Sequence, residues 1–237
     1  MKIYKIFFIL PFLMNFIYLN SSQASPSEYK ATYTFEKNGI TFAESKHKMT
    51  YDKKNDYWCI NTKSKSIGIF SLKKDERLED SCFVYELSKN YESSASSVSL
   101  TTLSYTYTRS KSQNSSRIES KEIDGSLITY LDKKIIKHGK DITIDRLVAQ
   151  IFGYSLDKIK VSDKGRERYY KFSTIGYENL DTVIGNVKTI IIKKEIEGSK
   201  RSTITWYSSD TNYLPIKIEQ YRLDELKFTA ILKSYER

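Results

Sequence analysis

The sequence is poor in the residues and motifs from which most catalytic and metal sites are built. It holds only two cysteines, Cys59 and Cys82, and two histidines, His47 and His138. A metal centre needs more ligands than these scattered residues offer, so the sequence predicts neither a metal site nor a cofactor. It also lacks a G-x-S-x-G elbow, a P-loop and the G-x-G-x-x-G, H-E-x-x-H and C-x-x-C motifs. We therefore do not expect an enzyme, although carboxylates on distant strands can act together without any local spacing.

Long apolar runs are also missing beyond the N-terminus, where the pattern is that of a secretory signal peptide. Lys2 and Lys5 precede an apolar stretch over residues 6–19, and Ser22-Gln23-Ala24 supplies small residues for cleavage. The sequence predicts that residues 1–24 are removed and that the mature protein is periplasmic. An uncleaved N-terminal anchor is the alternative. No linker divides the remainder, so residues 25–237 are expected to form a single domain.

The cysteine pair fits this compartment. In an oxidising environment two cysteines most simply pair, so we predict a disulfide between Cys59 and Cys82. On the chain-entropy model, closing the loop between them would stabilise the fold by roughly 3 kcal/mol.

The charge is strongly positive, with a formal net charge of +10 for the whole chain. A basic exported protein suits an anionic surface, such as lipid headgroups, lipopolysaccharide phosphates or a wall polymer, and peripheral contact with a membrane agrees with this. The alternative is that the charges only solvate strand faces, because they are scattered rather than clustered. The export signal disfavours nucleic acid as a partner.

Alternation of apolar and polar residues, the period of half-buried strands, dominates the chain after residue 28. Turn signals such as Asn38-Gly39 and Asp124-Gly125 separate these segments, and the polar stretch 110–116 is expected to be a loop tip. We predict an all-β, antiparallel, meandering barrel, open or closed, or else a sandwich. The eleven to thirteen expected strands lie near residues 29–35, 40–51, 57–66, 82–88, 98–108, 118–123, 126–131, 135, 168–175, 187–196, 203–208, 213–221 and 226–235.

One stretch, residues 141–154, repeats like a helix instead. Its apolar face consists of Ile144, Leu147, Val148, Ile151 and Phe152. Thr143 is expected to cap this helix and Gly153 to end it. We expect the helix to pack at the mouth or gap of the barrel, either completing the core or covering a ligand cavity. Asp145 and Arg146 could anchor it to strand ends through charge-assisted bonds.

Candidate lining residues for such a cavity are His47, Met49, Trp58 and Trp206. His47 shares a strand face with Met49, where a core or cavity histidine is a simpler interpretation than a catalytic base. The two tryptophans are expected in the core or, as a sharper hypothesis, in the wall of an apolar tunnel. Alternation alone does not separate a filled barrel from a hollow one.

Several short motifs follow one another in an order that is similar to that of a known family. They are Tyr29-Lys30-Ala31-Thr32-Tyr33, Asp145-Arg146-Leu147-Val148-Ala149-Gln150, Asp181-Thr182-Val183-Ile184-Gly185-Asn186-Val187-Lys188-Thr189, Thr205-Trp206-Tyr207 and Tyr213-Leu214-Pro215-Ile216-Lys217-Ile218. In this order they resemble the exported bacterial family called domain of unknown function 3108. That resemblance implies a periplasmic all-β protein without an established activity. The expected architecture is also similar to periplasmic lipoprotein carriers, which wrap an unclosed barrel around acyl chains under a helical lid.

The leading functional hypothesis is a non-catalytic periplasmic protein that supports the cell envelope by binding a lipid, another amphiphile or an envelope partner. The second is a structural or adaptor protein with a filled core that binds an envelope protein or a wall polymer. The third is an envelope hydrolase that would have to use His47 or His138 as its base.

Overall fold

The computed structural model of the protein describes residues 25–89, 96–111, 114–131, 134–136 and 142–237. These residues form one sheet of 15 strands, in the order β8-β7-β6-β5-β4-β3-β2-β1-β15-β14-β13-β12-β11-β10-β9. The strands are β1 (Tyr29–Lys37), β2 (Ile40–Asp52), β3 (Tyr57–Ser66), β4 (Asp75–Lys89), β5 (Ser96–Lys111), β6 (Asn114–Ile123), β7 (Ser126–Leu131), β8 (Lys134–Ile136), β9 (Ile144–Asp145), β10 (Lys158–Asp163), β11 (Arg166–Thr182), β12 (Gly185–Ile196), β13 (Arg201–Ser208), β14 (Leu214–Arg222) and β15 (Glu225–Glu236). The predicted signal peptide and His138 lie outside the described residues.

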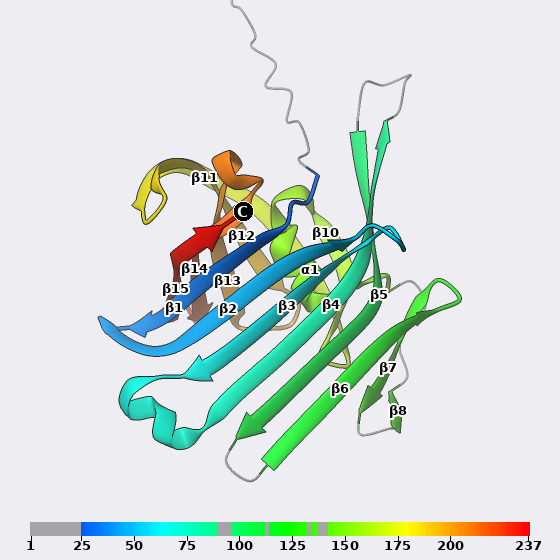
Figure 1. The fold of residues 1–237 in the computed structure, drawn as a ribbon, viewed down its shortest axis with the longest axis horizontal. Helices are drawn as coiled ribbons and strands as arrows, with labels where there is room; N and C mark the ends of the chain where they lie inside the picture. The colour runs from blue at the N-terminus through cyan, green and yellow to red at the C-terminus, as the bar shows by residue number, and fades with distance from the viewer. Residues whose placement is uncertain (1–24, 90–95, 112–113, 132–133, 137–141) are drawn as a thin grey trace, which may run out of the picture.

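The sheet curls into a nearly closed barrel (Figure 1). Its one seam lies between β8 and β9, the two ends of the strand order. From β1 to β8 and from β9 to β15, each strand pairs with the next one in sequence, and β1 also pairs antiparallel with β15, which joins the two halves of the meander. The inward face of β1 shows why this wall forms: Tyr29, Ala31 and Tyr33 alternate with more exposed residues and are buried. The predicted all-β meander is confirmed.

The expected strand count was too low, because β9 and β10 were not predicted. β9 has only two residues and exists through its parallel pairing with β10, where Ile144 lies opposite Val161. The polar stretch 110–116 was expected to be a loop tip, but most of it belongs to strands. There β5 extends to Lys111 and β6 begins at Asn114, so the hairpin is longer than its polar sequence suggests.

Residues 142–145 lie at the seam and connect its two sides by backbone hydrogen bonds; we call this segment the strut. The Thr102 amide donates a 2.8 Å hydrogen bond to the carbonyl of Thr143, and the Leu127 amide donates one of 3.0 Å to Ile142. Thr102 is available because β6 pairs with β5 only from Ser104 onward. The strut therefore connects the β4–β7 wall to β10 through backbone groups that would otherwise lack partners.

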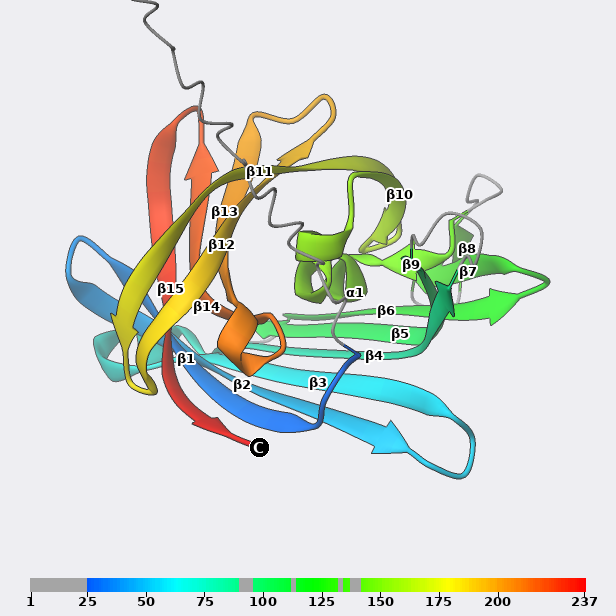
Figure 2. The same cartoon turned by 90° about the horizontal axis from the view of Figure 1, so that it is seen from above.

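The helix is shorter than the predicted stretch of residues 141–154. Helix α1 spans Arg146–Ile151, because the backbone just before it is already engaged in the strut and in β9. Asp145 caps it in place of Thr143. Figure 2 shows α1 between the β10–β11 arch and the sheet of β4 to β6, and it packs on β4, β9 and β10. The expected position of the helix at the mouth of the barrel is not confirmed. All five residues of the predicted apolar face are buried, namely Ile144, Leu147, Val148, Ile151 and Phe152.

Gly153 does not end the helix but begins a short 3-10 turn, η2 (Gly153–Ser155). A Cβ atom at this position would lie 2.7 Å from the Tyr207 hydroxyl and 2.8 Å from a Phe172 ring carbon. We expect Gly153→Ala to lower the free energy of unfolding by about 2 kcal/mol, because both rings must shift. Urea denaturation followed by tryptophan fluorescence measures this. In the control Gly176→Ala the new Cβ meets Ile191 at 3.6 Å, an ordinary contact, and equal losses in both variants would contradict the packing argument.

The predicted disulfide is confirmed: Cys59 and Cys82 lie directly opposite each other on β3 and β4 and are bonded. Pro215 sits beside an irregularity in the β13–β14 pairing, where the register shifts between Trp206 and Tyr207. Its carbonyl accepts a 2.9 Å hydrogen bond from the Tyr33 hydroxyl, which connects β14 to β1 across the interior.

Candidate functional site

A cavity of about 600 Å³, partly open to solvent, lies in the interior of the barrel. Strands from both halves of the sheet contribute to its wall, and α1 contributes Arg146, Leu147 and Gln150. The size is that of a small-molecule site rather than a packing defect. The barrel is therefore hollow, and the composition of its wall indicates what it can hold.

The wall is strongly basic. Two carboxylates, Glu79 and Asp163, face seven basic side chains, namely Arg77, Arg146, Lys164, Arg166, Arg168, Lys194 and Arg201. Positive charges that share a cavity with low-dielectric walls concentrate the local field and attract anions.

The negative charge of Glu79 is already paired with neighbouring side chains. Its carboxylate accepts a 2.5 Å hydrogen bond from Arg146 and a 2.7 Å bond from the Tyr105 hydroxyl. Asp163 lies 3.9 Å from the same guanidinium. Both cavity carboxylates thus pair with Arg146. Within the described residues, neither Lys164 nor Lys194 forms an ion pair with a carboxylate at 4.0 Å or less.

Arg146, Lys164 and Lys194 form what we call the interior basic cluster. Burial, and next the positive charge of Arg146, lower the pKa of Lys164 to about 8 and that of Lys194 to about 8. The Lys164 ammonium stands 3.8 Å above the Tyr107 ring, and the Lys194 ammonium stands 4.7 Å above the Tyr170 ring. Aromatic faces compensate only part of the lost hydration, so the cluster would gain from a bound anion.

The rest of the wall is mixed, with neutral polar side chains such as Ser45, Thr62 and Gln220 beside apolar ones. Its apolar members come from six separate elements, and they include Phe35, Ile118, Leu147, Ile196, Ile218 and Phe228. A cavity with cationic groups and apolar side chains in its wall suits a molecule that has an anionic group and a hydrocarbon part.

Asp145 holds α1 against this wall. Its carboxylate accepts hydrogen bonds from the Ser81 hydroxyl at 2.6 Å and the Thr102 hydroxyl at 2.8 Å. It also accepts from the backbone amides of Leu147 and Val148, at 2.7 and 3.2 Å. Burial raises the pKa of Asp145, and the hydroxyl and amide bonds act against that rise. The expectation that Asp145 and Arg146 anchor the helix to the strands is confirmed.

His47 lines the cavity as predicted. Its ring lies 4.7 Å from that of Tyr33, and its Nε2 is 3.0 Å from the Ser45 hydroxyl. Burial lowers the pKa of His47 to about 4, so the ring is neutral near pH 7. Its Nδ1 is buried without a hydrogen-bond partner in the described structure. A Ser–His pair is therefore present, but among the residues that the structure describes no carboxylate is hydrogen-bonded to the imidazole to orient it for catalysis.

The other three predicted lining residues lie elsewhere. Met49 is buried in the core beside α1's C-terminal end, and Trp58 packs with its ring centroid 4.8 Å from that of Tyr51. The Trp206 ring lies 4.2 Å from the Lys217 ammonium and donates its indole hydrogen to Glu178. Beside the irregularity of β13, Tyr207 takes the inward position and its hydroxyl bonds to the Gln150 carbonyl.

Sequence reasoning missed the basic wall because it searched for apolar inward faces. A signal existed on β11, where Arg168 precedes Tyr170 and Phe172 at a spacing of two residues. All three side chains therefore point to the same face of the strand, and Arg168 and Tyr170 both line the cavity. The basic residues of the cavity thus continue the alternation of the strands that carry them.

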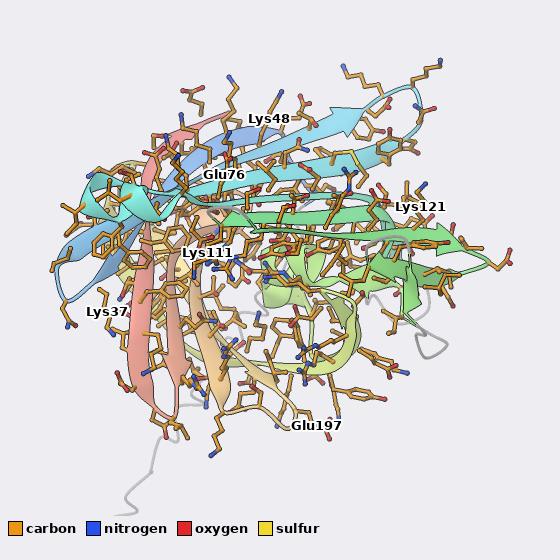
Figure 3. The ribbon with its side chains drawn as sticks, turned by 90° about the horizontal axis from the view of Figure 1, so that it is seen from below. Lys37, Lys48, Glu76, Lys111, Lys121 and Glu197 are labelled. Carbon is orange, nitrogen blue, oxygen red and sulfur yellow. A yellow bond between two sulfur atoms is a disulfide. The ribbon has the colours of Figure 1, made fainter. Side chains whose placement is uncertain are left out.

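A second hollow, of about 420 Å³, lies on the outer face of β1 to β4. Figure 3 shows Lys48 on that outer side of β2, away from the interior. Among the described residues, no group of three or more His, Cys, Asp or Glu side chains could hold a metal ion. No helix within the described part of the chain has both the length and the apolar character that crossing a membrane requires.

No protein-family model and no curated protein matches the chain, so the resemblance to domain of unknown function 3108 is not confirmed. Among solved structures, the chain is similar to a β-barrel-like protein of domain of unknown function DUF1849 from Brucella abortus. That likeness has a TM-score of 0.53 and 9% identity, covering 88% of this chain and 97% of the other.

Two further structures align with lower scores. A protein of YmcC-like fold from Bacteroides fragilis has a TM-score of 0.37 and 11% identity, covering 88% of this chain and 95% of the other. A protein from Parabacteroides distasonis has a TM-score of 0.41 and 10% identity, covering 89% and 96%. Of these three, the Brucella likeness bears on the architecture, and it supports a barrel-like fold alone.

Proposed function

We propose that this protein is a non-catalytic binding protein of the bacterial cell envelope that holds an anionic amphiphile inside its barrel. The observation that supports this most strongly is the cavity of about 600 Å³, with its surplus of basic side chains and the apolar side chains in its wall. The anionic group would lie at the interior basic cluster. The hydrocarbon part would lie against the rings of Phe35 and Phe228 and their neighbours.

A location outside the cytoplasm, in the periplasm, belongs to the same proposal. The Cys59–Cys82 disulfide supports it, because structural disulfides persist in oxidising compartments. The signal-peptide pattern over residues 1–24 agrees with the disulfide.

The two alternative hypotheses have less support. A filled-core adaptor does not need an empty, charged interior, and the charge surplus there would cost stability without a ligand. A hydrolase would rely on Ser45 and His47, whose neutral imidazole lacks an orienting carboxylate. Hydrolysis of an ester substrate that disappears in His47→Ala would nevertheless revive the hydrolase hypothesis.

The proposal predicts a charge-dependent affinity. We expect the purified protein to bind 11-(dansylamino)undecanoic acid, a fluorescent fatty acid, and to bind its methyl ester more weakly. Lys194→Gln should reduce the affinity for the acid roughly tenfold, because it removes one buried charge from the anion site. Titration by fluorescence gives both constants.

Lys233→Gln is the matched control, since Lys233 is an exposed lysine of β15 and does not line the cavity. It should bind the acid like the unchanged protein. Equal affinities for acid and ester, or equal losses in the two variants, would contradict an interior anion site. Repeated mass spectrometry of organic extracts that recovers no lipid, together with no uptake of the probe, would reject the proposal.

A further inference from the structure

An exposed apolar surface lies at one end of the barrel. The 3-10 turn η1 (Gly68–Lys73) joins β3 to β4 beside the β1–β2 turn (Figure 1). Leu72 is 86% exposed, Ile69 79% and Ile40 58%. Phe70 lines a shallow hollow of about 390 Å³ together with Ile40. We call Ile40, Ile69, Phe70 and Leu72 the apolar tip. Clustered apolar side chains at the end of a protein mark a contact site far more often than single ones do.

Basic residues surround the apolar tip. Lys37 and Lys227 line the same hollow, and exposed Lys74 follows η1 directly. Lys37 lies at this end of the molecule in Figure 3. Two carboxylates of this end are already paired: Asp75 binds Arg109 at 2.7 Å, and Glu225 binds Lys227 of the same hollow at 2.6 Å. Glu225 therefore offsets the charge of Lys227, and Lys37 and Lys74 supply the positive charge around the apolar tip. Apolar side chains surrounded by lysines complement an anionic lipid surface, where the lysines meet headgroups and the apolar groups enter the acyl boundary.

A row of aromatic rings connects the tip to the cavity. The ring centroids of Phe70 and Phe42 are 6.3 Å apart, and those of Phe42 and Phe228 are 6.4 Å apart. Phe228 in turn lies 5.5 Å from Phe35. Phe35 and Phe228 line the cavity, whereas Phe42 and Phe70 line the hollow at the tip. The ring contacts therefore form a row from the apolar tip to the wall of the cavity.

We propose that the apolar tip inserts into the surface of an anionic lipid bilayer, with the end of the barrel that carries η1 directed at the lipid. Exchange of an amphiphile between bilayer and cavity along the phenylalanine rings rests on the proposed function. The membrane contact itself depends only on the tip and its lysines, so the two parts can be tested separately.

The test is flotation of the full-length mature protein with vesicles of phosphatidylglycerol and phosphatidylethanolamine. We expect binding to these vesicles and little binding to pure phosphatidylcholine. The double variant Ile69→Glu, Leu72→Glu should lower the partition coefficient by about tenfold or more, because two apolar side chains no longer enter the acyl boundary. High salt should weaken the binding of the unchanged protein.

The matched control is Tyr177→Glu, Val183→Glu. These side chains are 76% and 55% exposed and lie near the β11–β12 turn, at the opposite end of the strands. The control should float like the unchanged protein. Equal flotation of the tip variant and the unchanged protein, or no flotation of either, would overturn the proposal. So would tip-dependent self-association in sedimentation without lipid, because the tip would then be an interface between copies.

The tip variant also separates this proposal from the preceding one. None of the substituted residues lines the cavity, so the variant should bind the dansyl fatty acid in solution like the unchanged protein. Tip-dependent flotation by a protein that binds no fatty acid would support the membrane contact and reject the amphiphile cavity. Fatty-acid binding without flotation would give the opposite result.

Discussion

The affinity for an anionic ligand should decrease between pH 7 and pH 9.5 as Lys164 and Lys194 lose their charge. With a bound anion that restores the ordinary lysine pKa, each of the two lysines contributes a decrease of about 30-fold. In the free protein each of these lysines has a pKa of about 8, so each loses its charge as the pH rises through that value. A bound anion favours the protonated form, and binding must then take up protons that the free protein has released. Fluorescence titrations of the fatty-acid probe across this pH range measure the decrease.

Lys194→Gln provides the control for this pH dependence. With one titrating lysine removed, the decrease should be about half as large on a logarithmic scale. The stability of the unliganded protein should change in the opposite sense. A lysine whose pKa is lowered by folding favours the folded state increasingly as the pH rises from about 8 towards its unfolded value near 10.4. An affinity that stays constant from pH 7 to pH 9.5 would exclude these lysines from the binding site.

Replacing Asp145 with alanine should lower the free energy of unfolding by about 3 to 5 kcal/mol. The substitution removes the cap of α1 and leaves the Ser81 and Thr102 hydroxyls without their buried carboxylate. It also leaves the Leu147 and Val148 amides without an acceptor. For a chain of this size the loss corresponds to a decrease in melting temperature of about 10 °C. Differential scanning calorimetry measures it.

Asp145→Asn is the conservative comparison, because the amide oxygen can still accept from the two backbone amides. We expect it to lose less than half as much stability as the alanine variant. If Asp145→Ala melts at the temperature of the unchanged protein, the carboxylate does not hold the helix in place.

Much of the sheet was predictable because its strands alternate and two of its hairpins carry Asn-Gly or Asp-Gly turns. The predicted bounds of residues 57–66 and 126–131 match β3 and β7. Prediction failed where inward residues are polar. The first half of β4 places Arg77 and Glu79 inside the barrel, so its sequence has no apolar period to detect.

The helix shows a different limit. Its apolar residues were identified correctly, and all five are buried, but two of them are not in the helix. Ile144 belongs to β9 and Phe152 follows the last helical turn. A local period of apolar residues cannot reveal that the Thr143 carbonyl accepts a hydrogen bond from the Thr102 amide, some forty residues earlier in the chain. Tertiary hydrogen bonds decided where the helix begins.

The site was harder to predict than the fold. His47 lines the cavity, whereas the apolar tunnel that was considered as an alternative to a filled core is not present, because the interior is basic. Lys164 and Lys194 meet Arg146 only after β10, β11 and β12 are paired. Scattered charges in the sequence thus become one cluster through strand register, which composition does not encode.

The pairing of β1 with β15 places the two ends of the domain side by side, with Lys30 opposite Glu236. Every other antiparallel pair in the meander joins strands that follow each other in the chain, so hairpins can form as soon as their residues emerge. The barrel, by contrast, can be completed only by its last twelve-residue strand. A chain cut before Glu225 would keep all earlier hairpins yet expose the bare edges of β1 and β14, a state suited to strand exchange and aggregation.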